Sequence, residues 1–208
     1  MTLHELSTGS VTTEWAARVV TAHLDGIGPV LGALELEATR LGNWAIHLAE
    51  HLEAGGRLLV AGNGGSAAEA QHLSAEFVGR FRTERRPYAA IALNCDSSAV
   101  TAIGNDYGFD QVFARQVRAH GRPGDILLLL STSGASANLI AAARAAAETG
   151  VMSWAITGAA PNPLATACDD ALCLPGAAAH VQEAELVAVH ALCVAFDALV
   201  GVEEDVAR

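Results

Sequence analysis

The chain has 208 residues, enough for one domain with its own hydrophobic core. Apolar residues make up 51% of the sequence and charged residues 17%, a composition that argues against disorder. The formal net charge of −11 argues against a nucleic-acid-binding surface, which is usually basic, and the longest apolar stretches are shorter than the roughly 18 residues of a membrane span.

The chain begins with a polar segment, "MTLHELSTGS", which lacks the basic start and apolar middle of a signal peptide. We therefore expect a cytoplasmic protein with no nucleic-acid or membrane partner. Helical patterns follow at about residues 11–26 and 30–54, and they carry more apolar side chains than one sheet face requires. This surplus indicates oligomerisation.

Five apolar runs of strand length come next and alternate with alanine-rich segments of helical length. A last helical pattern covers about residues 180–200. This alternation predicts an α/β fold of three layers, in which a five-stranded parallel sheet lies between helices. The predicted strands are residues 57–62, 88–94, 125–131, 151–157 and 170–176.

The first predicted strand ends in a glycine-rich turn, "GNGGSA", at residues 62–67. This turn overlaps the dinucleotide fingerprint G-x-G-x-x-A, but the acidic residue expected at the end of the second strand is missing, since Asp96 lies too far along the chain. It also lacks the Gly-Lys-Ser/Thr of a P-loop. Exposed N–H groups and the Ser66 hydroxyl at a helix start suit an anion, but a capped turn without a ligand is an equal alternative.

A second polar loop, "STSGASAN" at residues 131–138, follows the third predicted strand. It again places hydroxyl and N–H donors before a helix, although a simple polar helix cap has the same composition. In a flavodoxin-like strand order, 2-1-3-4-5, strands one and three flank the switch point where ligands bind. Two donor-rich loops at that point favour a bound phosphate or polyol.

Ionisable residues at helical spacing follow the first turn. His72, Glu76 and Arg80 are spaced four apart and could share one helix face, either as a surface ion-pair ladder or, for the first two, as metal ligands. Gln182 and His190 lie eight apart in the last helix, where a lone histidine is more often a satisfied core residue. Spacing alone does not join the two helices.

Four segments together resemble the sugar isomerase (SIS) domain family, and within it the phosphoheptose isomerase branch. They are "GNGGSAAEAQHLSAEFVGR", "AIGNDYGFDQVFARQV", "STSGASAN" and "VQEAELVAVH". The resemblance implies a SIS domain at residues 56–208, preceded by helices at residues 1–55 that belong to the same domain and serve oligomerisation. It further implies a homotetramer whose sites use more than one subunit, and an enediol isomerisation of sedoheptulose 7-phosphate to D-glycero-D-manno-heptose 7-phosphate.

The resemblance also implies roles for individual residues. Glu76 and His190 would form the proton-transfer pair. Zinc, which some members bind, would have His72, Glu76, Gln182 and His190 as ligands, with one ion per subunit; whether Glu76 is base, ligand or both stays open. The implied substrate contacts are Asn63 and Asp96 at sugar hydroxyls, Ser66, Ser131, Thr132, Ser133 and Ser136 at the phosphate, and also Gly64, Glu76, Arg80 and Gln182.

Two positions in the last helix depart from the family pattern. Ala179 stands where many phosphoheptose isomerases have an aspartate, and Glu185 where they usually have a histidine. A non-catalytic SIS protein is therefore the alternative function, either a tetrameric scaffold of the type that binds a replication initiator or a sugar-phosphate sensor. The retained Glu76, Gln182 and His190 favour the enzyme. A solvated or interfacial face is expected for the arginines of residues 82–86.

Overall fold

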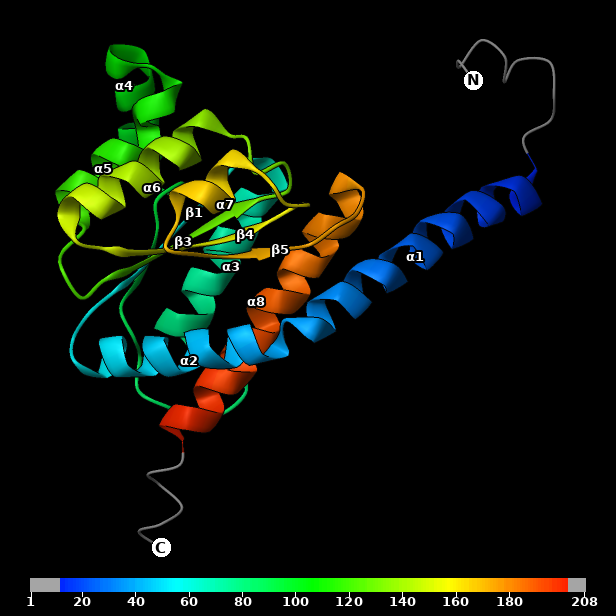
Figure 1. Cartoon of the computed structure of the whole chain (residues 1–208), viewed down its shortest axis with the longest axis horizontal. Coiled ribbons are helices and arrows are strands. Elements are labelled where there is room, and N and C mark those ends of the chain that lie inside the picture. The colour runs from blue at the N-terminus through cyan, green and yellow to red at the C-terminus, as the bar shows by residue number, and fades with distance from the viewer. Residues whose placement is uncertain (1–11, 202–208) are drawn as a thin grey trace, which may run out of the picture.

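The computed structural model describes residues 12–201, so the polar start of the chain and residues 202–208 lie outside the described residues. Its centre is a five-stranded parallel sheet with the strand order β2-β1-β3-β4-β5 (Figure 1). The α/β fold, the parallel sheet and the strand order predicted from the sequence are confirmed. The strands are β1 (Leu58–Gly62), β2 (Ala90–Ala92), β3 (Ile126–Ser131), β4 (Met152–Thr157) and β5 (Asp170–Cys173).

Helices cover both faces of the sheet. They are α1 (Thr13–Leu36), α2 (Ala38–Glu53), α3 (Gly64–Val78), α4 (Ser97–Tyr107), the 3₁₀ helix η2 (Phe109–Gln111), α5 (Val112–His120), α6 (Ala137–Thr149), α7 (Pro163–Ala167) and α8 (Ala178–Val200). Successive strand residues point to opposite faces. Leu58 and Val60 pack with α2, α3 and α8, whereas Leu59 and Ala61 pack with α5 and α6. Figure 1 shows these two helical layers on either side of the sheet.

The first two helices differ from the prediction. A break was expected between residues 26 and 30, but α1 continues through Pro29 as far as Leu36, and the break falls at Glu37. Proline costs one backbone hydrogen bond within a helix. Val30 and Leu34, which follow it, are buried in the core, so tertiary packing outweighs the local penalty.

The amino-terminal half of α1 extends away from the body of the molecule (Figure 1). Val19, Val20 and Leu24 are exposed there. An 18-residue window of this helix has a mean hydropathy of 1.2 and is only 11% buried, so by length and composition α1 could cross a membrane. This finding differs from the expectation that no stretch reaches that length. Contact between subunits explains an exposed apolar helix face equally well.

Candidate active site

Two glycine-containing turns lie side by side at the carboxyl ends of β1 and β3. Gly64 in the first turn and Gly134 in the second have φ values of +57° and +59°, a conformation that favours glycine. Asn63 and Asn138 exchange a reciprocal pair of side-chain hydrogen bonds, 3.0 and 2.9 Å long. The structure thus joins the two loops that the strand order placed at the switch point. Asn138, which the sequence reasoning did not single out, is the last residue of "STSGASAN".

The hydroxyl groups of the second loop lie at the amino-terminal end of α6. Ser131 is buried, accepts a hydrogen bond from the Gly134 N–H at 3.2 Å, and has its Oγ 3.4 Å from that of Ser136. Ser133 is exposed and Thr132 half-buried. Donors at a helix start attract anions, since the helix dipole adds to their partial charge. This loop is therefore suitably built for a phosphate group.

A cluster of ionisable side chains joins α3 to α8. His72 Nε2 lies 2.8 Å from His190 Nε2 and 3.4 Å from Glu76 Oε1. The Phe81 ring lies beside His190, with its centroid 5.2 Å from that of the imidazole. His190 is consequently not an isolated core histidine. The cluster connects residues 118 positions apart, which helical spacing alone did not reveal.

Two of the predicted substrate residues lie apart from this cluster. Arg80 follows the end of α3 and is exposed; its guanidinium lies 3.7 Å from Glu84 and donates to the Arg82 carbonyl. The shared helix face expected for it with His72 and Glu76 is not formed, because α3 ends at Val78. Asp96 is exposed and caps α4, accepting the Ala99 N–H at 3.0 Å. Their contacts with substrate stay predictions.

Gln182, from the first turns of α8, reaches the start of α3. A Cβ added to Gly65 would overlap its side-chain amide, so the absence of a side chain at Gly65 makes room for it. Gln182 also contacts Glu69. Gly65 is therefore required because the Gln182 side chain closely approaches its backbone, and not because of its backbone angles.

Substituting this glycine should disturb the site without unfolding the protein. Gly65→Ala forces the Gln182 amide to move, and a displacement of about 1 Å in an active site can cost about 100-fold in rate. We expect a loss of kcat/KM of that order, with an unchanged circular dichroism spectrum. Gly28→Ala is the control, since nothing lies within 4 Å of a Cβ at that position. Equal activity of the two variants would contradict the importance of this contact.

Glu185 lies fully buried between the two loops. The sequence had indicated only that this residue departs from the family pattern. Its Oε2 accepts the Ser66 hydroxyl at 2.8 Å, and Glu69 is adjacent. Burial raises the pKa of both carboxyls above 4.5, and the charge of Glu69 raises that of Glu185 further. The pair therefore holds a proton at pH values where an exposed glutamate would be ionised.

This raised pKa predicts a change of stability with pH. The folded protein binds the proton of Glu185 more tightly than the unfolded chain does, so stability should fall as pH rises above 4.5 towards neutrality. Glu185→Gln is neutral at every pH, and its free energy of unfolding should therefore improve relative to the wild type between about pH 5 and about pH 8. Urea unfolding at both pH values measures this, with the exposed Glu148→Gln as control. Parallel pH profiles for all three proteins would exclude the effect.

Arg85 is also buried, contrary to the solvated or interfacial face expected for it. Its side chain is 4% exposed and its Nε donates to Asp197 Oδ1 at 2.8 Å. The same guanidinium donates to the Glu76 carbonyl at 2.7 Å and to the Phe77 carbonyl at 3.1 Å. It thus fixes the last turn of α3, from which the Glu76 side chain extends. The sequence gives no signal that distinguishes Arg85 from its neighbour Arg86, which pairs with exposed Glu53.

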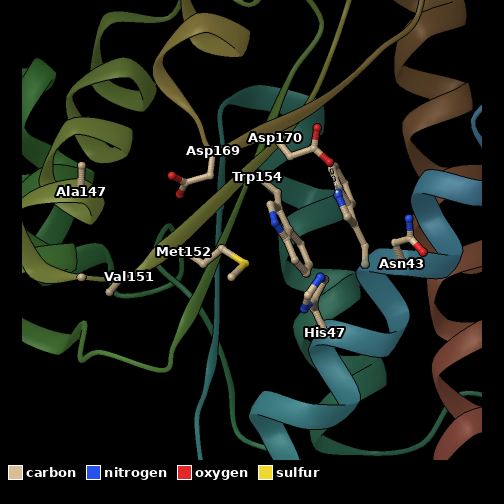
Figure 2. Close-up of a pocket in the computed structure, with 10 residues that line it drawn as sticks. Asn43, His47, Ala147, Val151, Met152, Trp154, Asp169 and Asp170 are labelled. Carbon is tan, nitrogen blue, oxygen red and sulfur yellow. Dashed lines mark hydrogen bonds between the residues drawn. The ribbon is translucent and has the colours of Figure 1, made fainter.

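A hollow in the surface lies elsewhere, beside the amino ends of β4 and β5 (Figure 2), and has a volume of about 660 Å³. Trp154 stacks there on Trp44, with ring centroids 4.8 Å apart. The two carboxylates of the hollow are occupied: Asp170 accepts from Trp44 Nε1, and Asp169 accepts from the backbone and hydroxyl of Ser153. Because ligands of such sheets bind at the carboxyl ends of the strands, this hollow does not compete with the site.

Comparison with known proteins shows the family of the chain. The sequence profile of the SIS domain matches residues 23–158. A phosphoheptose isomerase of Streptomyces coelicolor is 58% identical over 190 residues, which are 91% of this chain and 82% of the relative. The solved phosphoheptose isomerase of Francisella tularensis has a TM-score of 0.82 at 34% identity, covering 88% of this chain and 97% of its own. That of Neisseria gonorrhoeae has a TM-score of 0.81 at 40% identity, with coverages of 88% and 98%.

Proposed function

The chain belongs to the sugar isomerase (SIS) domain family, in its phosphoheptose isomerase branch, and from this premise we propose that it converts sedoheptulose 7-phosphate to D-glycero-D-manno-heptose 7-phosphate. One arrangement carries the proposal. His72, Glu76 and His190 form a cluster of acid–base groups, and two donor-rich loops are held together at the neighbouring strand ends. A carboxylate with two imidazoles suits proton transfer. The loops suit a phosphate.

The reaction moves hydrogen between C1 and C2 of the open-chain sugar through a cis-enediol. Glu76 removes the proton from carbon and returns it to the adjacent carbon, and His190 moves the proton between the two oxygens. Glu76 is only 17% exposed, and low access of water strengthens its interactions with substrate. The hydroxyls of Thr132, Ser133 and Ser136 hold the phosphate, whose negative charge the start of α6 stabilises.

A zinc ion fits the chemistry of this cluster. His72 and His190 direct two imidazole nitrogens at each other, and a Glu76 oxygen lies next to the first, which is the type of donor set that zinc prefers. Gln182, from the same face of α8 as His190, would complete the set. When bound, zinc would polarise the carbonyl and stabilise negative charge on the enediolate oxygens. Glu76 is a weaker base if it is a ligand at the same moment.

We further propose a cytoplasmic homotetramer. Exposed apolar side chains on α1 and α8 support association, among them Val20, Leu24, Val187 and Leu199. An apolar groove of about 450 Å³ lies between α1, α2 and α8 and offers a seat for a second copy of the chain. Sedimentation velocity tests this, and a monomer at micromolar concentration would contradict it.

A direct assay tests the function. The purified protein is incubated with sedoheptulose 7-phosphate, with added zinc or after removal of metal by a chelator, and the aldoheptose phosphate is measured. We expect product, and we expect chelation to reduce its rate of formation with recovery on adding zinc. Saturable binding of the sugar phosphate without product under any condition would instead support a sensor, and full activity after complete metal removal would refute the role of zinc.

A further inference from the structure

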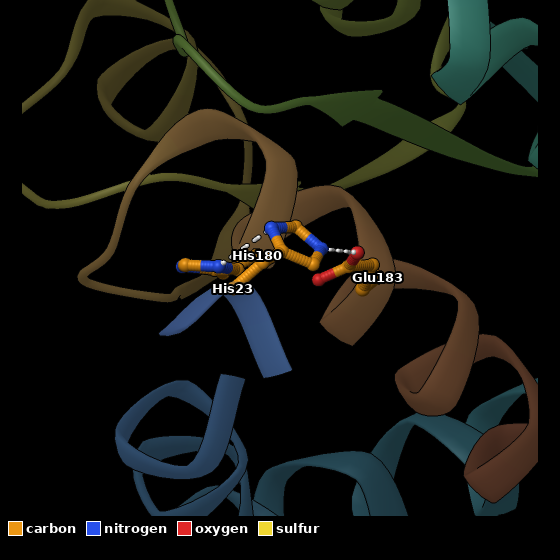
Figure 3. Close-up of side chains that lie close together, drawn as sticks. All are labelled: His23, His180 and Glu183. Atoms are coloured by element: carbon orange, nitrogen blue, oxygen red, sulfur yellow. Dashed lines mark hydrogen bonds and ion pairs between the residues drawn. The ribbon is translucent and has the colours of Figure 1, made fainter. Parts of the chain in front are cut away.

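A second group of potential metal ligands lies where α1 crosses the start of α8 (Figure 3). It consists of His23 from α1 and of His180 and Glu183 from α8. One ligand atom from each residue lies within 4.8 Å of the others. We propose that His23 and His180 bind a divalent transition-metal ion of the zinc type, and that Glu183 orients the His23 ring as its hydrogen-bond acceptor.

The distance between the two histidine nitrogens is that of two ligands of one ion. His23 Nδ1 lies 3.2 Å from His180 Nε2. Two nitrogens that bind one tetrahedral ion at about 2.0 Å are about 3.3 Å apart. The rings face each other at a tilt of 43°, with centroids 4.7 Å apart, so both lone pairs can be directed at one point between them.

Glu183 supplies the acceptor that orients the His23 ring. Its Oε1 lies 2.7 Å from His23 Nε2 and can accept the proton of that nitrogen, which leaves Nδ1 free to face His180. Its second oxygen, Oε2, is buried and has no hydrogen-bond partner among the described residues. A buried carboxylate oxygen without a partner is costly, and the positive charge of an ion on the far side of the His23 ring would offset part of that cost. His180 and Glu183, three apart on one helix face, contact the two different nitrogens of the His23 ring.

The backbone of α1 is adapted to this arrangement. A Cβ on Gly26 would overlap the His180 ring, so this glycine makes room for the imidazole one turn after His23. The buried residues of α1, Val30 and Leu34, lie farther towards its carboxyl end. An ion at His23 would therefore hold the helix at a point where apolar packing does not. The group shares no residue with the zinc ligands proposed for the active site.

Metal binding by a variant that lacks active-site ligands tests this second site separately. The variant His72→Ala/His190→Ala removes two of the ligands proposed there, and we expect it still to bind one Co²⁺ per chain, with the visible absorption of a cobalt–imidazole complex. Adding His23→Gln or Glu183→Gln should weaken this binding at least about tenfold. His47→Ala is the matched control, since this histidine is half exposed on α2 and outside the group, and it should leave binding unchanged.

A second measurement does not depend on the double variant. The unsubstituted protein, freed of metal and titrated with Zn²⁺, should bind two ions per chain, and His23→Gln should bind one. Zn²⁺ should also raise the Tm of the His72→Ala/His190→Ala variant, but not when His23→Gln is added. Absence of Co²⁺ binding in the double variant, or binding that His23→Gln leaves intact, would overturn the proposal and show that the three side chains form only a hydrogen-bonded group.

Discussion

Replacing Glu76 with glutamine should lower kcat for the isomerisation about 1000-fold, within the range that general acid–base catalysis contributes. Glutamine keeps the size of the side chain and a hydrogen-bonding oxygen near His72, but it cannot take a proton from carbon. The backbone of Glu76 stays held by Arg85, so the helix itself should not move. Steady-state kinetics with sedoheptulose 7-phosphate measure the loss.

The matched control for this variant is Glu84→Gln. Glu84 is 89% exposed, and its ion pair among residues 12–201 is with Arg80 at 3.7 Å, so its neutralisation should leave kcat within about twofold. Sedimentation velocity and thermal unfolding should be the same for both variants. If Glu76→Gln kept more than a tenth of the activity, the carboxylate would not be the base. If it lost both activity and assembly, its role would be structural.

Replacing Arg85 with methionine should destabilise the protein by about 3 to 5 kcal/mol, because it leaves the buried Asp197 carboxylate unpaired. Three rings also surround the guanidinium, those of Phe77, Tyr88 and Phe196, with centroids within 5.8 Å of its carbon. Methionine would recover part of this packing but none of the hydrogen bonds to the end of α3. Urea unfolding at one fixed protein concentration measures the difference.

A surface pair provides the comparison. Arg118 and Glu148 lie at a similar distance, 2.9 Å, but both are more than 40% exposed, so Arg118→Met should cost less than about 1 kcal/mol. The double variant Arg85→Met/Asp197→Leu should be more stable than Arg85→Met alone, since it removes the unpaired charge. A cost for Arg85→Met as small as that for Arg118→Met would show that water reaches Asp197 and that the pair is not the anchor of α3.

Local sequence patterns were sufficient to predict most of the fold. The strands β1, β3 and β4 are short apolar runs buried on both faces, and parallel strands of this kind are recognisable because alternating helices cover them. The break between α1 and α2 was misplaced, since glycine and proline near residue 28 are local signals, whereas the burial of Val30 and Leu34 depends on the tertiary structure.

The candidate site was predictable in part. The loops could be paired because the strand order determines which strand ends are neighbours, and the structure confirms that Asn63 and Asn138 meet. The meeting of His72 with His190 followed only from the family resemblance, since no local pattern relates α3 to α8. Arg85 escaped prediction because its burial results from a partner, Asp197, that lies 112 residues further along the chain.

Much of the candidate site comes from α8, and this determines when the site can form during synthesis of the protein. This helix supplies Gln182, Glu185 and His190, and it leaves the ribosome after all five strands. The two donor loops can close on each other through Asn63 and Asn138 while translation continues, because they precede it in the chain. The proposed acid–base cluster of His72, Glu76 and His190, by contrast, is assembled only when the final helix docks. A nascent chain can therefore acquire its sheet well before it acquires any capacity for chemistry.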